Sequence, residues 1–204
     1  RSAEAAVDDR GRGRGYPRTV ILGIDTSLGT AVAVIEADGI VRSERVSADP
    51  RGHAEVIGGL LVDALTEASI TPAQLTHVAA GMGPGPYTGL RVGIAAARTF
   101  ALGRGIAVVP VPSHDAAALG ILLADALLAD ADPERATPRF AVVTDARRRE
   151  FAYSVYEGID DDGLPLRVAG PALAPRDDVD SVVRALGAEP HVATDIPASM
   201  IALV

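Results

Sequence analysis

The chain has 204 residues and a net charge of −8, and its 48% of apolar residues can form the core of one domain or two small lobes. The acidic balance argues against a surface that binds nucleic acid unaided, because affinity for phosphate backbones depends largely on basic residues. Cysteine and lysine are both absent, which excludes disulfides, thiolate metal sites, Walker-type phosphate binding and Schiff-base chemistry.

Residues 1–18 have no apolar periodicity and contain Arg-Gly repeats, so we predict a disordered tail. Arg-Gly segments can bind RNA, which leaves two interpretations of this tail: an RNA-contacting arm or a flexible extension. The N-terminus lacks the apolar stretch of a secretory signal, and no apolar run in the chain is long enough for a membrane span. We therefore expect a cytoplasmic protein.

From residue 19 the chain alternates between strand and helix patterns. Five apolar runs predict strands, at 19–25, 31–37, 40–46, 76–81 and 106–111. Three segments with apolar residues at helical spacing predict helices, at 52–69, 88–102 and 113–131. Because Asp38-Gly39 is a hairpin signal, the first three strands form a meander, and two helical crossovers add the others. The pattern predicts a first lobe over 19–131 with a mixed five-stranded sheet.

A second round of the same pattern starts at residue 139. Its predicted elements are a hairpin of 139–146 with 149–157, a strand at 164–170, a helix at 175–187 and a strand at 191–194. We therefore expect an α/β protein of two similar lobes, in which the second lobe, over 139–204, is incomplete.

The segment GMGPGPYTG, residues 81–89, separates a predicted strand from a predicted helix. A phosphate-binding loop needs successive N–H donors, but Pro84 and Pro86 each remove one, and no lysine follows. We therefore expect the loop to set the direction of the next helix rather than to hold an anion. Thr88 is its predicted cap and Gly103 its predicted end.

The helix after this loop carries small residues every four positions, at Gly89, Gly93, Ala97 and Ala101, which lets a neighbouring backbone approach closely. Its other positions are mostly apolar, and helix 52–69 has an apolar arc wider than the ~100° that a sheet-facing helix requires. Either a third helix of this chain covers the excess, or a partner protein does, and we favour the partner. The candidate interface residues are Leu60, Leu61, Gly89, Arg91, Gly93, Ile94, Ala95 and Arg98.

Arg91 lies in the first turn of its predicted helix, where the helix dipole disfavours a cation by roughly 0.3–1 kcal/mol. We therefore expect a carboxylate close to Arg91, in this chain or in a partner.

The histidines predict no metal site. They lie at positions 53, 77, 114 and 191, never three or four apart, so no helix presents a ligand pair. Ser113-His114-Asp115 is not a catalytic triad, because adjacent side chains point in different directions. Ser113 is instead the predicted cap of its helix, with Asp115 in the favourable first turn.

Four motifs together resemble the TsaB (YeaZ) family: ILGIDTS, GHAEVIGGLLVDAL, AAGMGPGPYTGLRVGIAAARTFALG and VVTDARRREFAYSVY. The two-lobed pattern resembles the actin/Hsp70-like (ribonuclease H-like) fold of the sugar kinases. The resemblance covers residues 19–157 well, and GPGPYTGLRVG is its most specific part. It implies a non-catalytic subunit of the bacterial complex that makes threonylcarbamoyladenosine at tRNA position 37.

The resemblance also implies partners. A catalytic TsaD-like subunit of the same fold is the first, and an associated TsaE-like ATPase subunit is the second. The chain alone is expected to form a homodimer and to meet tRNA only indirectly, without a cofactor or metal of its own. Arg147, Arg148 and Arg149, at a predicted hairpin tip, are interpreted as a solvated turn, and a contact with tRNA is left open.

The larger fold suggests an alternative, an ATPase or phosphotransferase. There a carboxylate at the end of the first strand holds a metal-bound nucleotide, and Asp25 takes that position here. Hydroxyls follow at Thr26, Ser27 and Thr30, and Asp145 occupies the matching place in the second hairpin. Such a turn can equally bond its own backbone, and the segment HVATDIPAS lacks the glycine-rich turn that usually contacts adenosine. We therefore expect these loops to be a degenerate nucleotide site.

Overall fold

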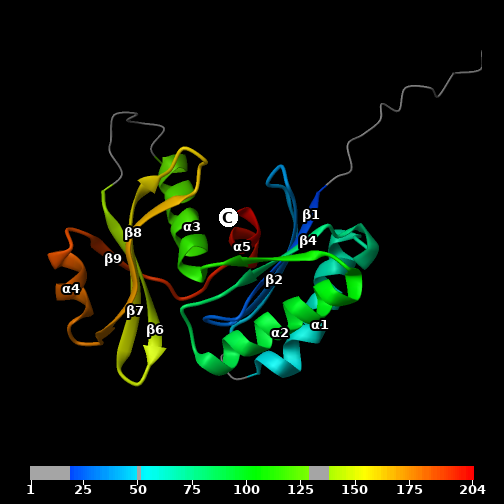
Figure 1. The fold of residues 1–204 in the computed structure, drawn as a ribbon, viewed down its shortest axis with the longest axis horizontal. Helices are drawn as coiled ribbons and strands as arrows, with labels where there is room; N and C mark the ends of the chain where they lie inside the picture. Colours follow the sequence, from blue (N-terminus) through cyan, green and yellow to red (C-terminus); the bar gives the residue numbers. More distant parts are fainter. Residues whose placement is uncertain (1–18, 50–51, 129–137) are drawn as a thin grey trace, which may run out of the picture.

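The computed structural model describes residues 19–49, 52–128 and 138–204, which form two sheets with helices between them and outside them (Figure 1). The tail predicted at 1–18 and the lobe boundary predicted at 131 lie outside the described residues. The predicted α/β fold is confirmed, with a five-stranded first sheet and a second sheet of four strands.

The first sheet has the order β3-β2-β1-β4-β5 and is mixed, as predicted. The meander consists of β1 (Val20–Asp25), β2 (Thr30–Glu36) and β3 (Val41–Ser47), paired antiparallel. The parallel strands are β4 (His77–Gly81) and β5 (Ala107–Val111). Both β1 and β2 are buried almost throughout, because helices cover both faces of the sheet there.

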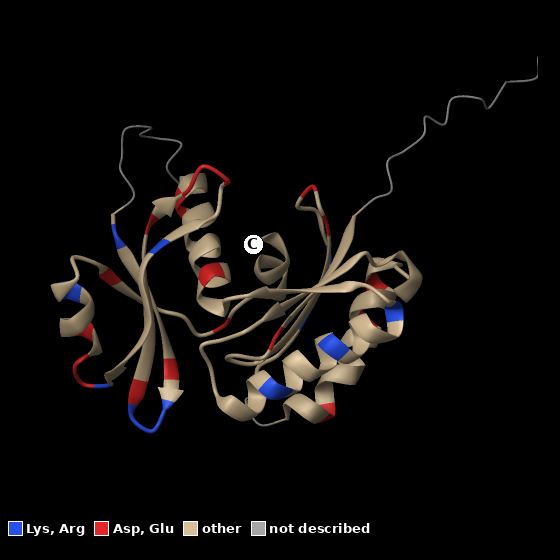
Figure 2. Ribbon diagram, viewed as in Figure 1, with Lys and Arg blue, Asp and Glu red and all other residues tan. Residues whose placement is uncertain are grey.

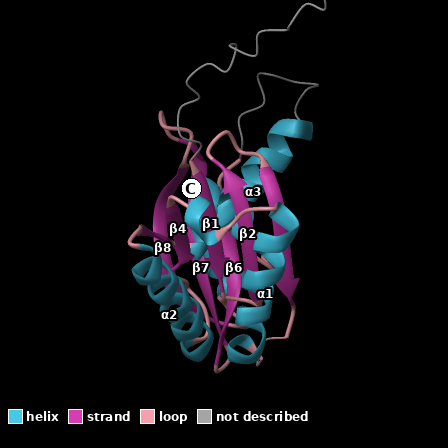
Figure 3. Cartoon of the chain, turned by 90° about the vertical axis from the view of Figure 1, so that its right-hand side faces the viewer, coloured by secondary structure: helices cyan, strands magenta, loops and turns pink. Residues whose placement is uncertain are grey.

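One face of this sheet is covered by α1 (His53–Ala68) and α2 (Tyr87–Arg104), which pack against each other (Figures 1 and 3). A short 3₁₀ turn, η1 (Pro72–Gln74), follows α1. The predicted ends of α2 are wrong. The helix begins directly after the extended Pro86, so Thr88 lies inside it. It ends at Arg104 and is followed by Gly105, which has the left-handed φ of +66° that is typical of a helix end.

The second sheet has the order β8-β7-β6-β9 and repeats the topology of β3-β2-β1-β4. Its strands and helix are β6 (Phe140–Arg147), β7 (Glu150–Ile159), β8 (Pro165–Pro175), α4 (Val179–Ala185) and β9 (Glu189–Val192). Strand β6 takes the place that β1 has in the first sheet: it pairs antiparallel with β7 and parallel with β9.

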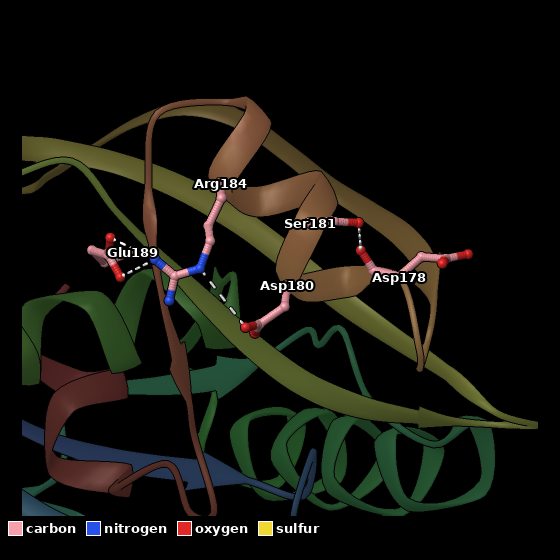
Figure 4. A network of polar contacts seen from close by, with 5 residues as sticks. All are labelled: Asp178, Asp180, Ser181, Arg184 and Glu189. Atoms are coloured by element: carbon pink, nitrogen blue, oxygen red, sulfur yellow. Dashed lines mark hydrogen bonds and ion pairs between the residues drawn. The ribbon is translucent and has the colours of Figure 1, made fainter.

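The helix predicted at 175–187 is shorter than expected because β8 continues to Pro175, which pairs with Glu150. On the outer side of α4, Arg184 pairs with Asp180 and, at 2.8 Å, with Glu189, so the helix is joined to β9 (Figure 4).

Between the sheets lie α3 (Ser113–Leu128) and α5 (Ala198–Leu203) (Figure 1). Their side chains join those of both sheets in one hydrophobic core, with Phe140 and Tyr156 as its largest members. The expectation that 139–204 forms the second lobe is therefore wrong for α5. This helix packs on the first sheet so closely that a Cβ at Gly23 would overlap the carbonyl of Ala198. No described helix is long and apolar enough to cross a bilayer.

Candidate functional site

Asp25 lies at the C-terminal end of β1, is buried, and accepts hydrogen bonds on both carboxylate oxygens. The N–H of Ser27 donates to Oδ1 at 2.8 Å, the Ser27 hydroxyl donates to the same oxygen, and the hydroxyl of Ser113 donates to Oδ2 at 2.6 Å. A Cβ at Gly81 would overlap Oδ2, so only glycine leaves room for this carboxylate. Burial raises the pKa of Asp25, and the bonds from Ser113 and Ser27 oppose that shift. Both oxygens therefore have partners within the chain.

The glycine-rich loop is bonded to the start of α3. The N–H of Gly83 donates to the hydroxyl of Ser113 at 3.0 Å, and the N–H of Ser113 donates to the carbonyl of Gly83 at 2.8 Å. The predicted capping role of Ser113 is therefore wrong, because its hydroxyl joins the loop to Asp25 instead of bonding its own helix. Gly83, with a φ of +87°, needs the conformational freedom of glycine. These contacts support the expectation that the loop orients α2.

Thr26 and Thr30 connect the β1–β2 turn to the two outer helices. The hydroxyl of Thr26 donates to the carbonyl of Gly89 at 2.8 Å, and that of Thr30 lies 2.8 Å from Nδ1 of His53 at the start of α1. A Cβ at Gly93 would overlap the Thr26 hydroxyl. The placement of Gly89 and Gly93 on a partner interface is therefore wrong. The close approach predicted for them is made by the chain's own hairpin.

Asp145 stands apart from this cluster. Its Oδ1 accepts the N–H of Arg147 at 2.7 Å, its Oδ2 accepts from the Arg176 guanidinium at 2.9 Å, and its side chain is 40% exposed. The structure thus brings Asp25, Thr26, Ser27 and Thr30 together but leaves Asp145 on the other lobe. Ser27 of the first hairpin and Asp145 of the second both line one cleft of about 400 Å³, to which Phe151 and Pro86 also contribute.

The first turn of α3 connects the two lobes, a role that the sequence did not predict. While Ser113 bonds Asp25 in the first lobe, His114 reaches into the second, with Nδ1 2.9 Å from the hydroxyl of Ser154 and Nε2 2.9 Å from that of Thr144. Burial lowers the pKa of His114 to about 3, so the imidazole is neutral. Thr144 and Ser154, polar residues within apolar strands, were the signal that a buried polar partner exists.

The next residue, Asp115, completes this connection. Its carboxylate accepts a hydrogen bond from the hydroxyl of Tyr156 at 2.7 Å and lies 3.5 Å from the guanidinium of Arg167. Together with Ser113 and His114, it contacts strands on both sides of the lobe boundary. The three consecutive residues act as a structural junction and not as a catalytic triad.

The outer faces of α1 and α2 combine uncovered glycines with exposed apolar side chains. A Cβ at Gly58, Gly59 or Gly103 would have no neighbour within 4 Å, and Val62 and Leu102 are exposed by 63% and 84%. We call this surface the α1–α2 face.

The remaining predicted interface residues divide into two groups. Arg91, Ala95 and Arg98 are exposed on the α1–α2 face, whereas Ile94 is half-buried. Leu60 and Leu61 are also half-buried and pack against the core under the helices.

The carboxylate expected near Arg91 is not found among the described residues. Its guanidinium lies instead over the ring of Tyr87, 4.0 Å from the centroid. Across the described ranges, histidine and carboxylate side chains form no cluster of three or more that could hold a metal ion.

Sequence comparison identifies the family. A family model described as TsaD, tRNA N6-adenosine threonylcarbamoyltransferase, matches residues 42–196. An uncharacterised protein of Mycobacterium tuberculosis is 38% identical over 179 residues, which are 86% of this chain and 75% of the relative. The tRNA N6-adenosine threonylcarbamoyltransferase of Rhodopseudomonas palustris is 36% identical over 128 residues, which are 53% of this chain and 35% of that enzyme.

Structural comparison identifies the fold. YeaZ from Pseudomonas aeruginosa superimposes with a TM-score of 0.70 at 22% identity, covering 91% of this chain and 90% of YeaZ. A second structure from that organism, described as similar to peptidase YeaZ, gives the same score and identity. The predicted resemblance to YeaZ is thereby confirmed in the fold. The chain belongs to the family of TsaD, the tRNA N6-adenosine threonylcarbamoyltransferase, and has the fold of YeaZ (TsaB).

Proposed function

We propose that the chain is a non-catalytic, cytoplasmic subunit that binds a TsaD-like transferase and supports it in modifying adenosine 37 of tRNA. The family match indicates the process in which the chain takes part, the threonylcarbamoylation of adenosine in tRNA. The observation that carries the subunit role is the α1–α2 face, where Val62 and Leu102 are largely exposed and glycines leave the helix backbone uncovered. Exposed apolar side chains gathered on one surface are typical of protein–protein contact sites. A TsaE-like ATPase is the further partner in this proposal.

The α1–α2 face fits a pair of helices from a protein of the same fold. On α2 the exposed positions Arg91, Ala95, Arg98 and Leu102 follow helical spacing and form one stripe. On α1 the glycines at 58 and 59 leave the backbone uncovered, so another helix can approach closely. Arg91 and Arg98, for which the described residues offer no carboxylate partner, then lie where carboxylates of the partner can reach them. Without the transferase, two copies of this chain would associate through the same face in a two-fold arrangement.

The occupied carboxylates support a non-catalytic role over the ATPase alternative. Asp25 has both oxygens bonded within the chain, and Asp145 is paired with Arg176. A metal-bound nucleotide would have to displace these partners. Titration calorimetry with ATP tests this directly: we expect no binding in the micromolar range. Micromolar binding that Asp145→Ala abolishes would favour the ATPase.

Reconstitution of tRNA modification with the TsaD-like subunit tests the proposal as a whole. Ala95→Glu places a longer side chain at the centre of the α1–α2 face, with its carboxylate between Arg91 and Arg98 on the same helix stripe. It would take these arginines from the partner's carboxylates and obstruct the approaching helix, so supported activity should fall by roughly tenfold or more. Leu127→Glu is the matched control, since Leu127 is 81% exposed on α3, away from this face. Full activity of Ala95→Glu, or modification by this chain without the transferase, would contradict the proposal.

A further inference from the structure

Three consecutive arginines form the tip of the β6–β7 hairpin, and all three have a left-handed backbone. The φ values of Arg147, Arg148 and Arg149 are +69°, +52° and +64°. A residue with a Cβ is disfavoured in this conformation, which glycine adopts freely. Two other hairpin turns of the chain follow that rule, with Gly39 at +87° and Gly163 at +81°. The need for a tight turn therefore does not explain why arginine occupies this one.

These residues, which we call the arginine tip, are exposed and have no carboxylate partner among the described residues. Arginines elsewhere in the same lobe, such as Arg139 and Arg184, each pair with a glutamate. The nearby carboxylate of Asp145 is taken by Arg176. Figure 2 shows the tip as a continuous blue segment that projects from the second sheet. The tip is thus a concentrated positive charge on a protein whose net charge is −8.

The position of the arginine tip is well defined. The N–H of Arg176 at the end of β8 donates to the carbonyl of Arg149 at 2.8 Å, and Asp145 accepts the N–H of Arg147. The Arg176 guanidinium lies 5.1 Å from the ring of Phe151 beneath the tip. A backbone bond at Arg149 and the Asp145 carboxylate at Arg147 therefore support the two ends of the exposed tip, and such preorganisation lowers the entropic cost of binding.

We propose that the arginine tip binds phosphates of the tRNA backbone directly, an inference that rests on the proposed function. Guanidinium groups match phosphate oxygens in pairs, and consecutive arginines on a narrow tip can contact neighbouring phosphates. The tip carries no exposed large apolar residue, whereas protein interfaces have an apolar centre. A polyanionic backbone therefore fits it better than an acidic protein surface. Contact with tRNA is then direct, contrary to the indirect contact that the family resemblance implies.

The test measures binding of a fluorescently labelled tRNA transcript to the complex of this chain with the TsaD-like subunit, and to the chain alone, over a series of salt concentrations. The variant replaces all three residues of the tip by glutamine. A control variant, R45Q/R139Q/R184Q, changes the net charge equally at arginines that are ion-paired in the native protein. We expect the tip variant to bind roughly tenfold more weakly or worse, and the slope of log K against log salt to fall by about 2. The control should match the native protein.

A single substitution separates binding from folding. Arg148→Gly relieves the left-handed strain, so the melting temperature should rise while tRNA affinity falls. If the turn has only a structural role, Arg148→Gly would gain stability and keep its affinity for tRNA. That result would overturn the inference.

An unchanged affinity and salt slope in the tip variant would also overturn it, while leaving the proposed function intact if the complex still forms. If the tip variant loses the TsaD-like subunit but keeps tRNA binding, the tip contacts protein and the RNA assignment is wrong. Absence of tRNA binding in both the complex and the chain alone would contradict the inference as well.

Discussion

The two lobes contain the same turn in two different environments. In each lobe the first strand carries an aspartate that accepts the N–H of the residue two positions later, Ser27 at 2.8 Å in the first lobe and Arg147 at 2.7 Å in the second. In the first lobe the aspartate is buried and also bonded to Ser113 from α3. In the second it is 40% exposed and paired with Arg176. The same aspartate turn is therefore part of the packed interior in the first lobe and lies at the solvent-exposed surface in the second.

The difference follows from what comes after each crossover strand. After β4 the chain forms α2, whose glycine face packs on the Asp25 turn. After β9 the chain continues to α5, which packs on the first sheet and leaves the Asp145 turn without a covering helix among the described residues. A repeated topology thus does not imply a repeated site, because the covering element decides whether a turn is buried.

Removing each aspartate in turn gives the largest expected contrast. Asp25→Ala leaves Ser27, Ser113 and Gly83 with disrupted buried hydrogen bonds, so the free energy of unfolding should fall by about 3 kcal/mol or more. Asp145→Ala removes an exposed ion pair and should cost less than about 1 kcal/mol. Urea denaturation of both variants provides the measurement. An equal loss of unfolding free energy in the two variants would contradict the different roles assigned to the two aspartates.

The junction between the lobes should make stability depend on pH through His114. Its pKa is about 3 in the folded protein, against an ordinary value of 6.5 in the unfolded chain, so the unfolded chain binds the proton first. Stability should therefore fall as the pH drops below about 6.5. His114→Gln, which cannot titrate, should be less stable than the native protein at neutral pH, with a gap that narrows by about 2–3 kcal/mol between pH 6.5 and 4.5.

This comparison isolates His114, because Asp25, whose pKa is raised by burial, titrates in both proteins. Urea denaturation at several pH values is the measurement. A constant gap between the two proteins would mean that His114 is not neutral in the folded state.

Two glycines test which helix faces are packed. Gly93→Ala forces a methyl group against the Thr26 hydroxyl and should lower the free energy of unfolding by about 1–3 kcal/mol. Gly59→Ala, on the open α1–α2 face, should raise it by roughly 0.5–1 kcal/mol, because alanine favours helix. Thermal denaturation of the isolated chain compares them. If Gly93→Ala were neutral, the hairpin would not approach α2 as closely as the structure shows.

The outer side of the second lobe should give the smallest effect. A double-mutant cycle of Arg184→Ala with Glu189→Ala should yield a coupling of less than about 1 kcal/mol, because both side chains are more than half exposed and solvent screens the pair (Figure 4). A larger coupling would mean that β9 depends on α4 more than its exposure indicates.

The sequence predicted the sheets well, because alternating apolar runs and an Asp-Gly turn depend on local chemistry. It did not predict long-range polar partners. Serine at a helix start is typical of a cap, and nothing local reveals that the hydroxyl of Ser113 bonds Asp25 instead, 88 positions earlier. The four-residue spacing of Gly89 and Gly93 indicated that another segment approaches the helix closely, but it could not identify that segment as the turn at Thr26. The short α5 escaped prediction because only its packing on the first sheet shows its place.

The central claim is that this chain acts by contact through the α1–α2 face. Sedimentation velocity of the purified chain, alone and mixed with the TsaD-like subunit, tests it most directly when native protein, Ala95→Glu and Leu127→Glu are compared. We expect the native protein and Leu127→Glu to sediment as a dimer alone and as a mixed complex with the partner, and Ala95→Glu to remain a folded monomer in both. A folded Ala95→Glu that still associates as the native protein does would contradict the account.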